Sequence, residues 1–308
     1  MRTPSAGPAD LTTAEHAIDV RFRTLLARLP RRGPAGWLTE FLVFGLKQAW
    51  ACVFGAAMLA VILAARLWYP DDAALARNDA LTLAAVAIQV AMVTTRLETL
   101  RELRVVLLFH VVGTAMEVFK TEVGSWTYAS EGVLRLGGVP LFSGFMYAAV
   151  GSYLVRVHRL FDLRFTRYPR RWVTALVAVA VYVNFFTNHY VYDVRWLLLG
   201  AVALVFGRCV MHFRVFRFRW RMPLLLAFLL VAFFIWLAEN IATWSQAWLY
   251  PSQVDGWHPV SLAKLTSWFL LMIISVVLVT WISPPQPPER VTGRTGSAGR
   301  DRQTRPDG

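Results

Sequence analysis

Long apolar segments separated by short polar ones fill the chain between residues 48 and 283. A helix needs about 20 mostly apolar residues to cross the hydrocarbon of a membrane. Eight segments approach this length, so the pattern predicts eight transmembrane helices. Five are free of charge over most of a membrane thickness, namely Gln48 to Ala65, Gly137 to Val155, Trp172 to Phe186, Met222 to Leu237 and Leu265 to Ser283. Three are shorter or contain an ionisable residue, namely Ala80 to Thr95, Val105 to Phe119 and Trp196 to Met211.

The composition favours the same interpretation. Of the 308 residues, 56% are apolar and 14% are aromatic. One water-soluble core cannot bury that much apolar surface, so the surplus must face lipid. We therefore expect an all-α fold, a polytopic bundle of about eight transmembrane helices whose main partner is membrane lipid. The sequence leaves the oligomeric state open.

Basic residues alternate between the segments that join the eight helices. The segment before the first helix, the loops after the second, fourth and sixth helices and the carboxyl-terminal tail hold 26 of the 32 Lys and Arg residues, and the four other loops hold 6. Cytoplasmic loops are enriched in Lys and Arg, so both termini are predicted to be cytoplasmic. The same rule accounts for the arginine-rich loops at residues 156–171 and 208–221, and we expect no nucleic-acid binding despite the net charge of +13.

The two ends of the chain differ from the apolar middle. Residues 1–36 form a predicted cytoplasmic segment in which Thr12 and Glu15 stand at the spacing of a capping box. The apolar residues that follow share one helical face, either of a short solvated helix or, as we favour, of an amphipathic helix lying on anionic lipid. They are Ile18, Phe22, Leu25, Leu26 and Leu29. Residues 37–283 form the transmembrane domain, and residues 284–308 are predicted to be a disordered cytoplasmic tail.

Polar residues inside the apolar segments are few, and each requires an explanation because a charge in hydrocarbon costs at least about 2.5 to 3.5 kcal/mol. In the third segment His110, Gly113, Glu117 and Lys120 follow helical spacing and share one face. A rise of about 1.5 Å per residue places Glu117 roughly 20 Å from the cytoplasmic edge, in the outer half of the membrane.

Other polar groups are expected at a similar depth or in the loops outside it. We expect Glu117, Glu239 and His189 to be catalytic, because clustered titratable groups in an apolar setting are typical of an active site. The candidate substrate-binding residues are His110, Lys120, Trp126, Tyr128, Asn184, Tyr190, Asp193, Asn240 and His258. The alternative is structural: aromatic residues form interface belts, Glu117 pairs with Lys120, and His189 anchors a loop.

Several other chemistries find no support in the sequence. It contains no phosphate-binding glycine loop, no zinc-protease helix and no Gly-x-Ser-x-Gly motif. We expect no metal site, and the cofactor remains unknown. Gly144, Ala148 and Ser152 repeat every four residues, which predicts a close helix contact.

Five segments carry a resemblance to the bacterial YoaT-type membrane proteins, the family called domain of unknown function 817. They are Phe109 to Lys120, Gly124 to Tyr128, Pro140 to Tyr147, Thr187 to Tyr190 and Ala238 to Thr243. The resemblance covers roughly residues 40 to 283. It implies a multi-pass protein of the bacterial cytoplasmic membrane and brings no reaction with it.

A second and fainter similarity is to the membrane carotenoid hydratases. It rests on Glu117, on the turn from Gly124 to Tyr128 and on Val139 to Leu141. Lys120 and the loop lengths depart from that family.

Three functions are compatible with these patterns. The first is a membrane-embedded enzyme that acts on an apolar polyprenoid or lipid substrate through a polar pocket in the outer half of the membrane. The second is a small-solute transporter that uses the same residues as its binding site. The third is a membrane scaffold in which the polar cluster only locks the helices together.

Overall fold

A computed structural model describes residues 11–26, 33–129 and 132–288, and within these ranges the protein is mostly helical. The first five helices are α1 (Thr13–Leu26), α2 (Pro34–Ala51), α3 (Val53–Trp68), α4 (Arg77–Thr94) and α5 (Leu100–Glu122). The other five are α6 (Phe142–Leu160), α7 (Arg171–Thr187), α8 (Arg195–Phe206), α9 (Leu224–Trp244) and α10 (Ala263–Ile282), with a short 3-10 turn η1 (Pro251–Gln253) before the last. The strands are β1 (Arg135–Leu136), β2 (Val139–Pro140), β3 (Arg164–Thr166), β4 (Val210–Arg214) and β5 (Arg219–Pro223).

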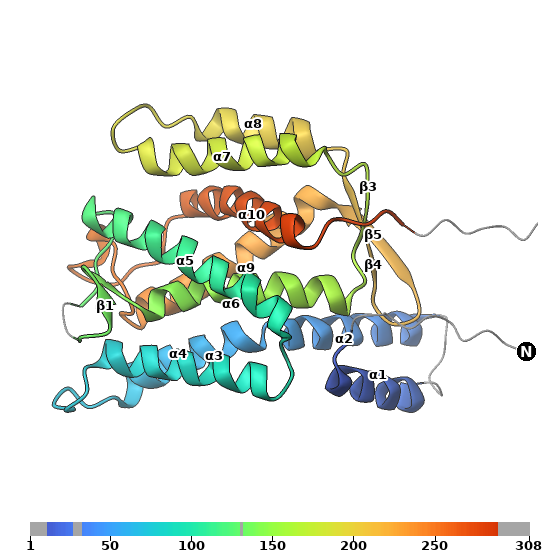
Figure 1. The fold of residues 1–308 in the computed structure, drawn as a ribbon, viewed down its shortest axis with the longest axis horizontal. Helices are drawn as coiled ribbons and strands as arrows, with labels where there is room; N and C mark the ends of the chain where they lie inside the picture. Colours follow the sequence, from blue (N-terminus) through green and yellow to red (C-terminus); the bar gives the residue numbers. More distant parts are fainter. Residues whose placement is uncertain (1–10, 27–32, 130–131, 289–308) are drawn as a thin grey trace, which may run out of the picture.

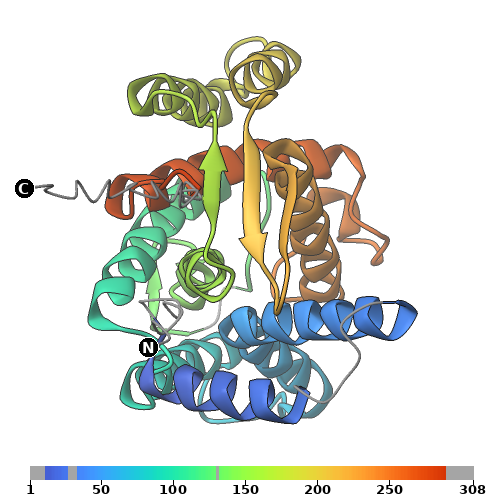
Figure 2. The same ribbon diagram turned by 90° about the vertical axis from the view of Figure 1, so that its right-hand side faces the viewer.

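The helices from α3 onward run between two ends of the molecule, and from α4 each reverses the direction of the one before it (Figure 1). At one end lie β3, β4 and β5, together with the start of α2 and the end of α10, and we call this the sheet end. At the other lie β1, β2 and the connections after α3, α5, α7 and α9, and we call this the loop end. Figure 2, which views the sheet end, shows α7 and α8 at the edge of the bundle.

All eight predicted segments are helical over most of their length, but their boundaries need correction. The all-α expectation overlooked two small sheets, β1-β2 and β3-β4-β5. Residues 210 and 211, which we had predicted as helix, belong to β4, and residues 222 and 223 belong to β5. These two strands pair in antiparallel register, from Val210 opposite Pro223 to Arg214 opposite Arg219. Apolar residues alternate with arginines from Phe216 to Met222, which is a strand pattern, but a prediction based on long apolar runs does not use it.

The first predicted transmembrane helix also begins earlier than expected. Helix α2 starts at Pro34, which follows Gly33 in a conformation with a φ of 82°, and α3 continues after Cys52 with a bend of 65° between the two helices. Proline suits the first helical position because its missing N–H has no partner there in any case. The expected boundary at Gln48 marked the start of the charge-free run and not that of the helix.

Two helices, α9 and α10, qualify as membrane spans by length and composition, and the bent pair α2 and α3 makes a third if it counts as one span. Helices α7 and α8 are apolar but shorter, with 17 and 12 residues. Helices α4, α5 and α6 each contain ionisable residues.

Helices α5 and α6 approach each other closely through small residues. A Cβ atom on Gly144 would lie 2.3 Å from Thr114 Oγ1, and one on Gly151 would lie 2.9 Å from the ring of Phe109. Ala148 and Ser152 are fully buried. The spacing of small residues in the sequence therefore marked a real contact, because only small side chains permit such an approach.

The amino-terminal helix α1 is tied to the sheet end by a buried charge network. The predicted capping box is present, with the Thr12 amide donating to Glu15 Oε2 (3.1 Å) and the Glu15 amide donating to Thr12 Oγ1 (3.4 Å). Glu15 also pairs with Arg159 Nη2 at 2.8 Å, and Glu102 binds the other terminal nitrogen of Arg159. The first turn of α1 thus contacts protein, while lipid contact by the rest of α1 stays a prediction. Leu29 lies outside the described residues.

The three-stranded sheet is fixed to several helices. Glu40 of α2 accepts hydrogen bonds from the amides of Phe216 and Arg217 at the tip of the hairpin, at 3.2 and 2.8 Å. The amide of Phe165 in β3 donates to the carbonyl of Gln286, beyond the end of α10, at 2.9 Å. The sheet therefore connects the ends of helices α6 to α10 and α2 at one end of the bundle.

Candidate functional site

The carboxyl group of Glu117 is buried near the loop end, in the last two turns of α5, with 3% of the residue exposed. Its Oε2 accepts hydrogen bonds from Trp126 Nε1 and from the hydroxyl of Tyr128, both at 2.7 Å. Its Oε1 accepts one from the hydroxyl of Tyr147 on α6, at 2.6 Å. Three neutral donors therefore surround this acid, and within the described residues they take the place of the pairing with Lys120 that the structural alternative supposed.

The turn after α5 delivers two of these donors. Gly124 adopts a φ of 72°, and the amide of Ser125 donates to the carbonyl of Lys120 at 2.9 Å. This is the Schellman arrangement, which favours glycine at the left-handed position. It reverses the chain so that Trp126 and Tyr128 fold back over the end of the helix.

Glu239 on α9 is enclosed by aromatic donors in the same way, with 3% of the residue exposed. We call each of these carboxyl groups with its donors a cage. Its Oε1 accepts from the hydroxyl of Tyr250 at 2.5 Å. Its Oε2 accepts from Trp268 Nε1 on α10 at 2.8 Å. Each acid is thus held by aromatic donors from a loop and from a neighbouring helix.

The two cages lie against each other. Thr127 and Leu249 exchange two backbone hydrogen bonds of 3.0 Å, which join the turn after α5 to the segment after α9. The rings of Trp126 and Tyr250 then meet edge to face, with centroids 6.0 Å apart. Lys264 Nζ lies 4.2 Å from the centroid of Tyr250 and 5.6 Å from that of Trp126. The structure therefore brings Glu117 and Glu239 together, as one polar site.

The two loop tyrosines of the site are held in the donor form. Burial raises the pKa of Tyr128 well above its usual value, and the nearby charge of Glu117 raises it further. Burial and Glu239 do the same to the pKa of Tyr250. Both phenols therefore keep their protons at neutral pH and donate hydrogen bonds to the carboxyl groups.

His189, the third candidate catalytic residue, lies beside this site in a separate polar group. Its Nε2 is 2.9 Å from Lys120 Nζ and 3.2 Å from Ser125 Oγ. Partial burial lowers the pKa of His189, and the charges of Lys120 and Lys264 lower it further. At neutral pH the ring is uncharged, so it can accept a hydrogen bond from the lysine.

The remaining predicted residues mainly hold loops in place. Asn184 binds Asp193 Oδ1 and the amide of Val194, both at 3.0 Å. Asn240 accepts from the amide of Val260 at 2.8 Å. The sequence predicts both asparagines at a depth similar to that of the acids, but no hydrogen bond of theirs reaches Glu117 or Glu239 within the described part of the chain.

The last three candidates also lie apart from the carboxyl groups. His258 is exposed and contacts the carbonyls of Ser252 and Pro259, and Tyr190 is 72% exposed. His110 packs on Phe145, with ring centroids 4.5 Å apart.

Sequence reasoning missed four residues of the site: Tyr147, Tyr250, Trp268 and Lys264. Tyr147 follows Gly144 by three residues and so shares the helical face of the predicted close contact. Lys264 precedes Trp268 by four residues, so these two share a face of the last helix. A buried acid needs donors, and the tyrosines and tryptophans of adjacent segments were the signal available in the sequence.

A narrow, mostly apolar crevice is lined by two of the donors to the acids. Its lining includes Tyr147 and Trp268, which donate to the two acids, together with apolar side chains from α5, α6, α7, α9 and α10. The free volume is about 40 Å³, enough for a very small molecule such as water without rearrangement. The crevice therefore lies beside the polar site, and the side chains of Tyr147 and Trp268 belong to both.

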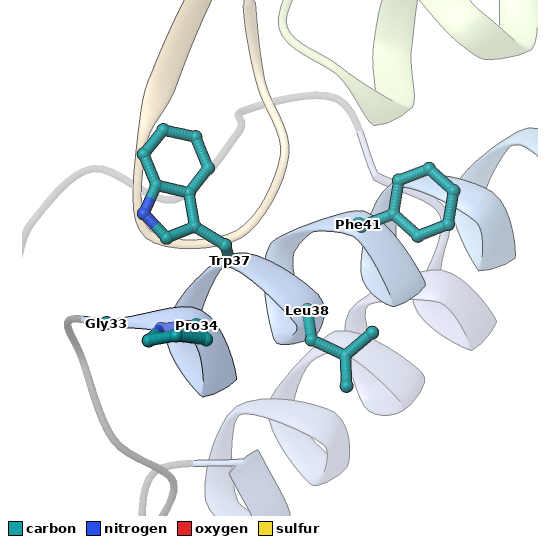
Figure 3. Close-up of a pocket in the computed structure, with 5 residues that line it drawn as sticks. All are labelled: Gly33, Pro34, Trp37, Leu38 and Phe41. Atoms are coloured by element: carbon teal, nitrogen blue, oxygen red, sulfur yellow. The ribbon is translucent and has the colours of Figure 1, made fainter.

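A second, open hollow lies at the sheet end, at the start of α2. Figure 3 shows Trp37, Leu38 and Phe41 projecting from this helix beside Gly33 and Pro34. The ring of Trp37 meets that of Trp220 in the hairpin, with centroids 5.0 Å apart. The described residues of its lining include no ionisable group, so they offer apolar contact.

Across residues 11–26, 33–129 and 132–288, no three His, Cys, Asp or Glu side chains gather as a metal site would require.

Comparison with known proteins gives the family. Residues 40–276 match the family described as Protein of unknown function (DUF817). Over 242 residues the chain is 43% identical to the "Uncharacterized protein YoaT" of Bacillus subtilis (strain 168), an alignment that covers 79% of this chain and 91% of that protein. No solved structure matches. A match of this extent shows that the chain belongs to the DUF817 family.

Proposed function

We propose that the protein crosses the bacterial cytoplasmic membrane eight times, with both termini in the cytoplasm. The alternation of α3 to α10 between two ends supports this topology (Figure 1). The basic residues concentrate at the sheet end, as cytoplasmic loops require. Helix α7 carries an exposed apolar stripe that suits lipid, formed by Trp172, Leu176, Val179 and Val183, each at least 51% exposed.

This topology predicts the outcome of reporter fusions. Fusions within residues 67–79, 122–136, 188–194 and 245–260 should report a periplasmic location. Fusions near residues 160 and 215 should report a cytoplasmic one, because these connections hold the arginines. An alkaline phosphatase and fluorescent protein pair measures both. A cytoplasmic signal from the loop at 245–260 would refute the eight-span topology.

We further propose that the protein is an enzyme of the membrane interior that acts on an apolar polyprenoid or lipid substrate. The observation that carries this proposal is the mostly apolar crevice whose lining includes Tyr147 and Trp268, the donors to the two acids. The lining suits an apolar chain, although the helices must move apart to admit one, and a reacting group held beside Tyr147 and Trp268 would be near Glu117 and Glu239. We assign Glu117 the role of acid or base, Glu239 that of its partner and His189 a place at the outer rim.

The scaffold remains the second candidate, and one observation favours it. All four oxygens of the two carboxyl groups already have hydrogen-bond donors, as a purely structural lock would provide. In that case the cages stabilise helix contacts and take part in no reaction.

The variant Glu117→Gln separates the two candidates. For an enzyme, we expect the variant to insert and fold while losing the phenotype of the gene, because an amide cannot exchange a proton as a carboxyl group does. Glu122→Gln, which changes an exposed residue on the same helix, is the matched control and should retain full function. The readouts are complementation of a deletion strain and thermal stability in detergent. Full complementation by Glu117→Gln would contradict the enzyme and favour the scaffold.

A further inference from the structure

Three basic side chains converge at the loop end, where basic residues are rare. They come from separate elements: Lys120 from the last turn of α5, Arg195 from the start of α8 and Lys264 from the first turn of α10. The charges of Lys264 and Arg195 both repel that of Lys120, and Arg195 also repels Lys264. Bringing like charges together is unfavourable unless an opposite charge joins them.

Lys264 has unused hydrogen-bonding capacity. Its ammonium group lies over the rings of Tyr250 and Trp126, at 4.2 and 5.6 Å from their centroids. Within the described residues it makes no hydrogen bond and has no carboxylate oxygen within 4 Å. Glu239 attracts it from a greater distance, but both oxygens of that acid are held by Tyr250 and Trp268. The three N–H donors of the half-buried Lys264 ammonium are therefore available to an acceptor.

Lys120 is in a similar position. Only 3% of the residue is exposed, and its ammonium binds two neutral partners, Asn188 Oδ1 at 3.3 Å and His189 Nε2 at 2.9 Å. Asp193, the acid whose charge attracts Lys120, is itself paired with Arg195 at 2.9 Å. The ammonium also lies over the ring of Phe185, 4.1 Å from its centroid. A buried ammonium without a paired acid among the described residues is suited to accept an anion.

We propose that Lys120 and Lys264 bind the phosphate group of an amphiphile whose apolar chain enters the crevice. This inference rests on the proposed function and names the class of its substrate. Lysine binds phosphate well as a compact point charge. Ser125 Oγ, at 3.2 Å from His189, lies within the same polar group. Trp268, which lines the crevice, stands one helical turn from Lys264, so headgroup and chain sites adjoin.

The test uses the full protein in detergent with three probes: farnesyl phosphate, farnesol and inorganic phosphate. Quenching of tryptophan fluorescence measures binding, because Trp126 and Trp268 lie in the site. We expect farnesyl phosphate to bind at least roughly ten-fold more tightly than farnesol, since only the phosphate adds a charge contact. Lys120→Gln and Lys264→Gln should each lower the affinity for farnesyl phosphate about ten-fold and leave the affinity for farnesol unchanged.

Two further variants serve as controls for charge and for folding. Arg66→Gln removes an exposed cation at the loop end whose hydrogen bond is to Gln246, and it should bind all probes as the unmodified protein does. Lys264→Arg keeps the charge and should retain most of the preference for farnesyl phosphate over farnesol. A folding defect in Lys264→Gln would be recognised separately, because that variant would then lose farnesol binding as well.

The outcomes separate the headgroup from the apolar chain. Equal affinity for farnesol and farnesyl phosphate would overturn the phosphate site while leaving the apolar substrate of the proposed function in place. Equal affinity for inorganic phosphate and farnesyl phosphate would overturn the lipid source and assign the cations to a free anion. Binding of inorganic phosphate alone would contradict the proposed function itself.

Discussion

Replacing Arg159 with methionine is expected to lower the free energy of unfolding by about 3 to 5 kcal/mol, because it leaves two buried carboxylates without their cation. Arg159 holds both Glu15 and Glu102, and its side chain is only 6% exposed. Thermal unfolding in detergent measures the change. The same variant should also loosen the first turn of α1, because Glu15 would then keep only the hydrogen bond from Trp50 Nε1, at 3.3 Å, as its side-chain link to the bundle.

Two controls accompany this prediction. Arg104→Met changes an exposed arginine on α5 near the same end and should leave stability nearly unchanged. The triple variant Arg159→Met, Glu15→Gln, Glu102→Gln removes the stranded charges and should recover most of the loss. If the triple variant is no more stable than Arg159→Met, the loss comes from packing and not from charge.

Gly113→Ala should damage fold and site together. A Cβ atom at this position would lie 2.4 Å from the ring of Tyr147, so the ring must move away from Glu117. Overpacking of this kind costs about 1 to 3 kcal/mol, and the lost hydrogen bond to a buried carboxyl group adds about 1 to 3 kcal/mol. Thermal unfolding and complementation of a deletion strain should fall in parallel.

The matched control is Gly200→Ala on α8, where a Cβ atom would meet nothing within 4 Å. Alanine favours helix over glycine, so this change should stabilise by about 0.5 to 1 kcal/mol. If Gly113→Ala also stabilises the protein, the close contact of α5 with Tyr147 is not as described.

The sequence predicted the helices well because each of the eight segments is a long apolar run, and a helix pairs the backbone groups of such a run within the segment itself. The hairpin from Val210 to Pro223 was missed because the prediction rested on long apolar runs and did not use the alternation of apolar residues with arginines from Phe216 to Met222. Its pairing also depends on β3, more than forty residues earlier. The contact of α1 with Arg159 was equally hidden, since nothing local indicates a partner so far along the chain.

The candidate site was predictable in its acids but not in their partners. Glu117 and Glu239 stood out because charges are rare in apolar segments. Helical rise gives the depth of Asn184 and Asn240, but not the direction in which they point, and both turn toward loops. The donors Tyr147, Tyr250 and Trp268 could not be separated from the many aromatic residues that any membrane interface attracts.

The hydrogen-bonded sheet has a consequence for how the bundle moves. Because β3, β4 and β5 bind one another, Glu40 and the segment beyond α10, the helices they connect share a common pivot at that end. Small rotations about this pivot displace the far ends of α5, α9 and α10 most, which is where the crevice meets the two acids. In the proposed function, a substrate chain would therefore enter where the helices separate at the loop end, while the sheet end stays closed.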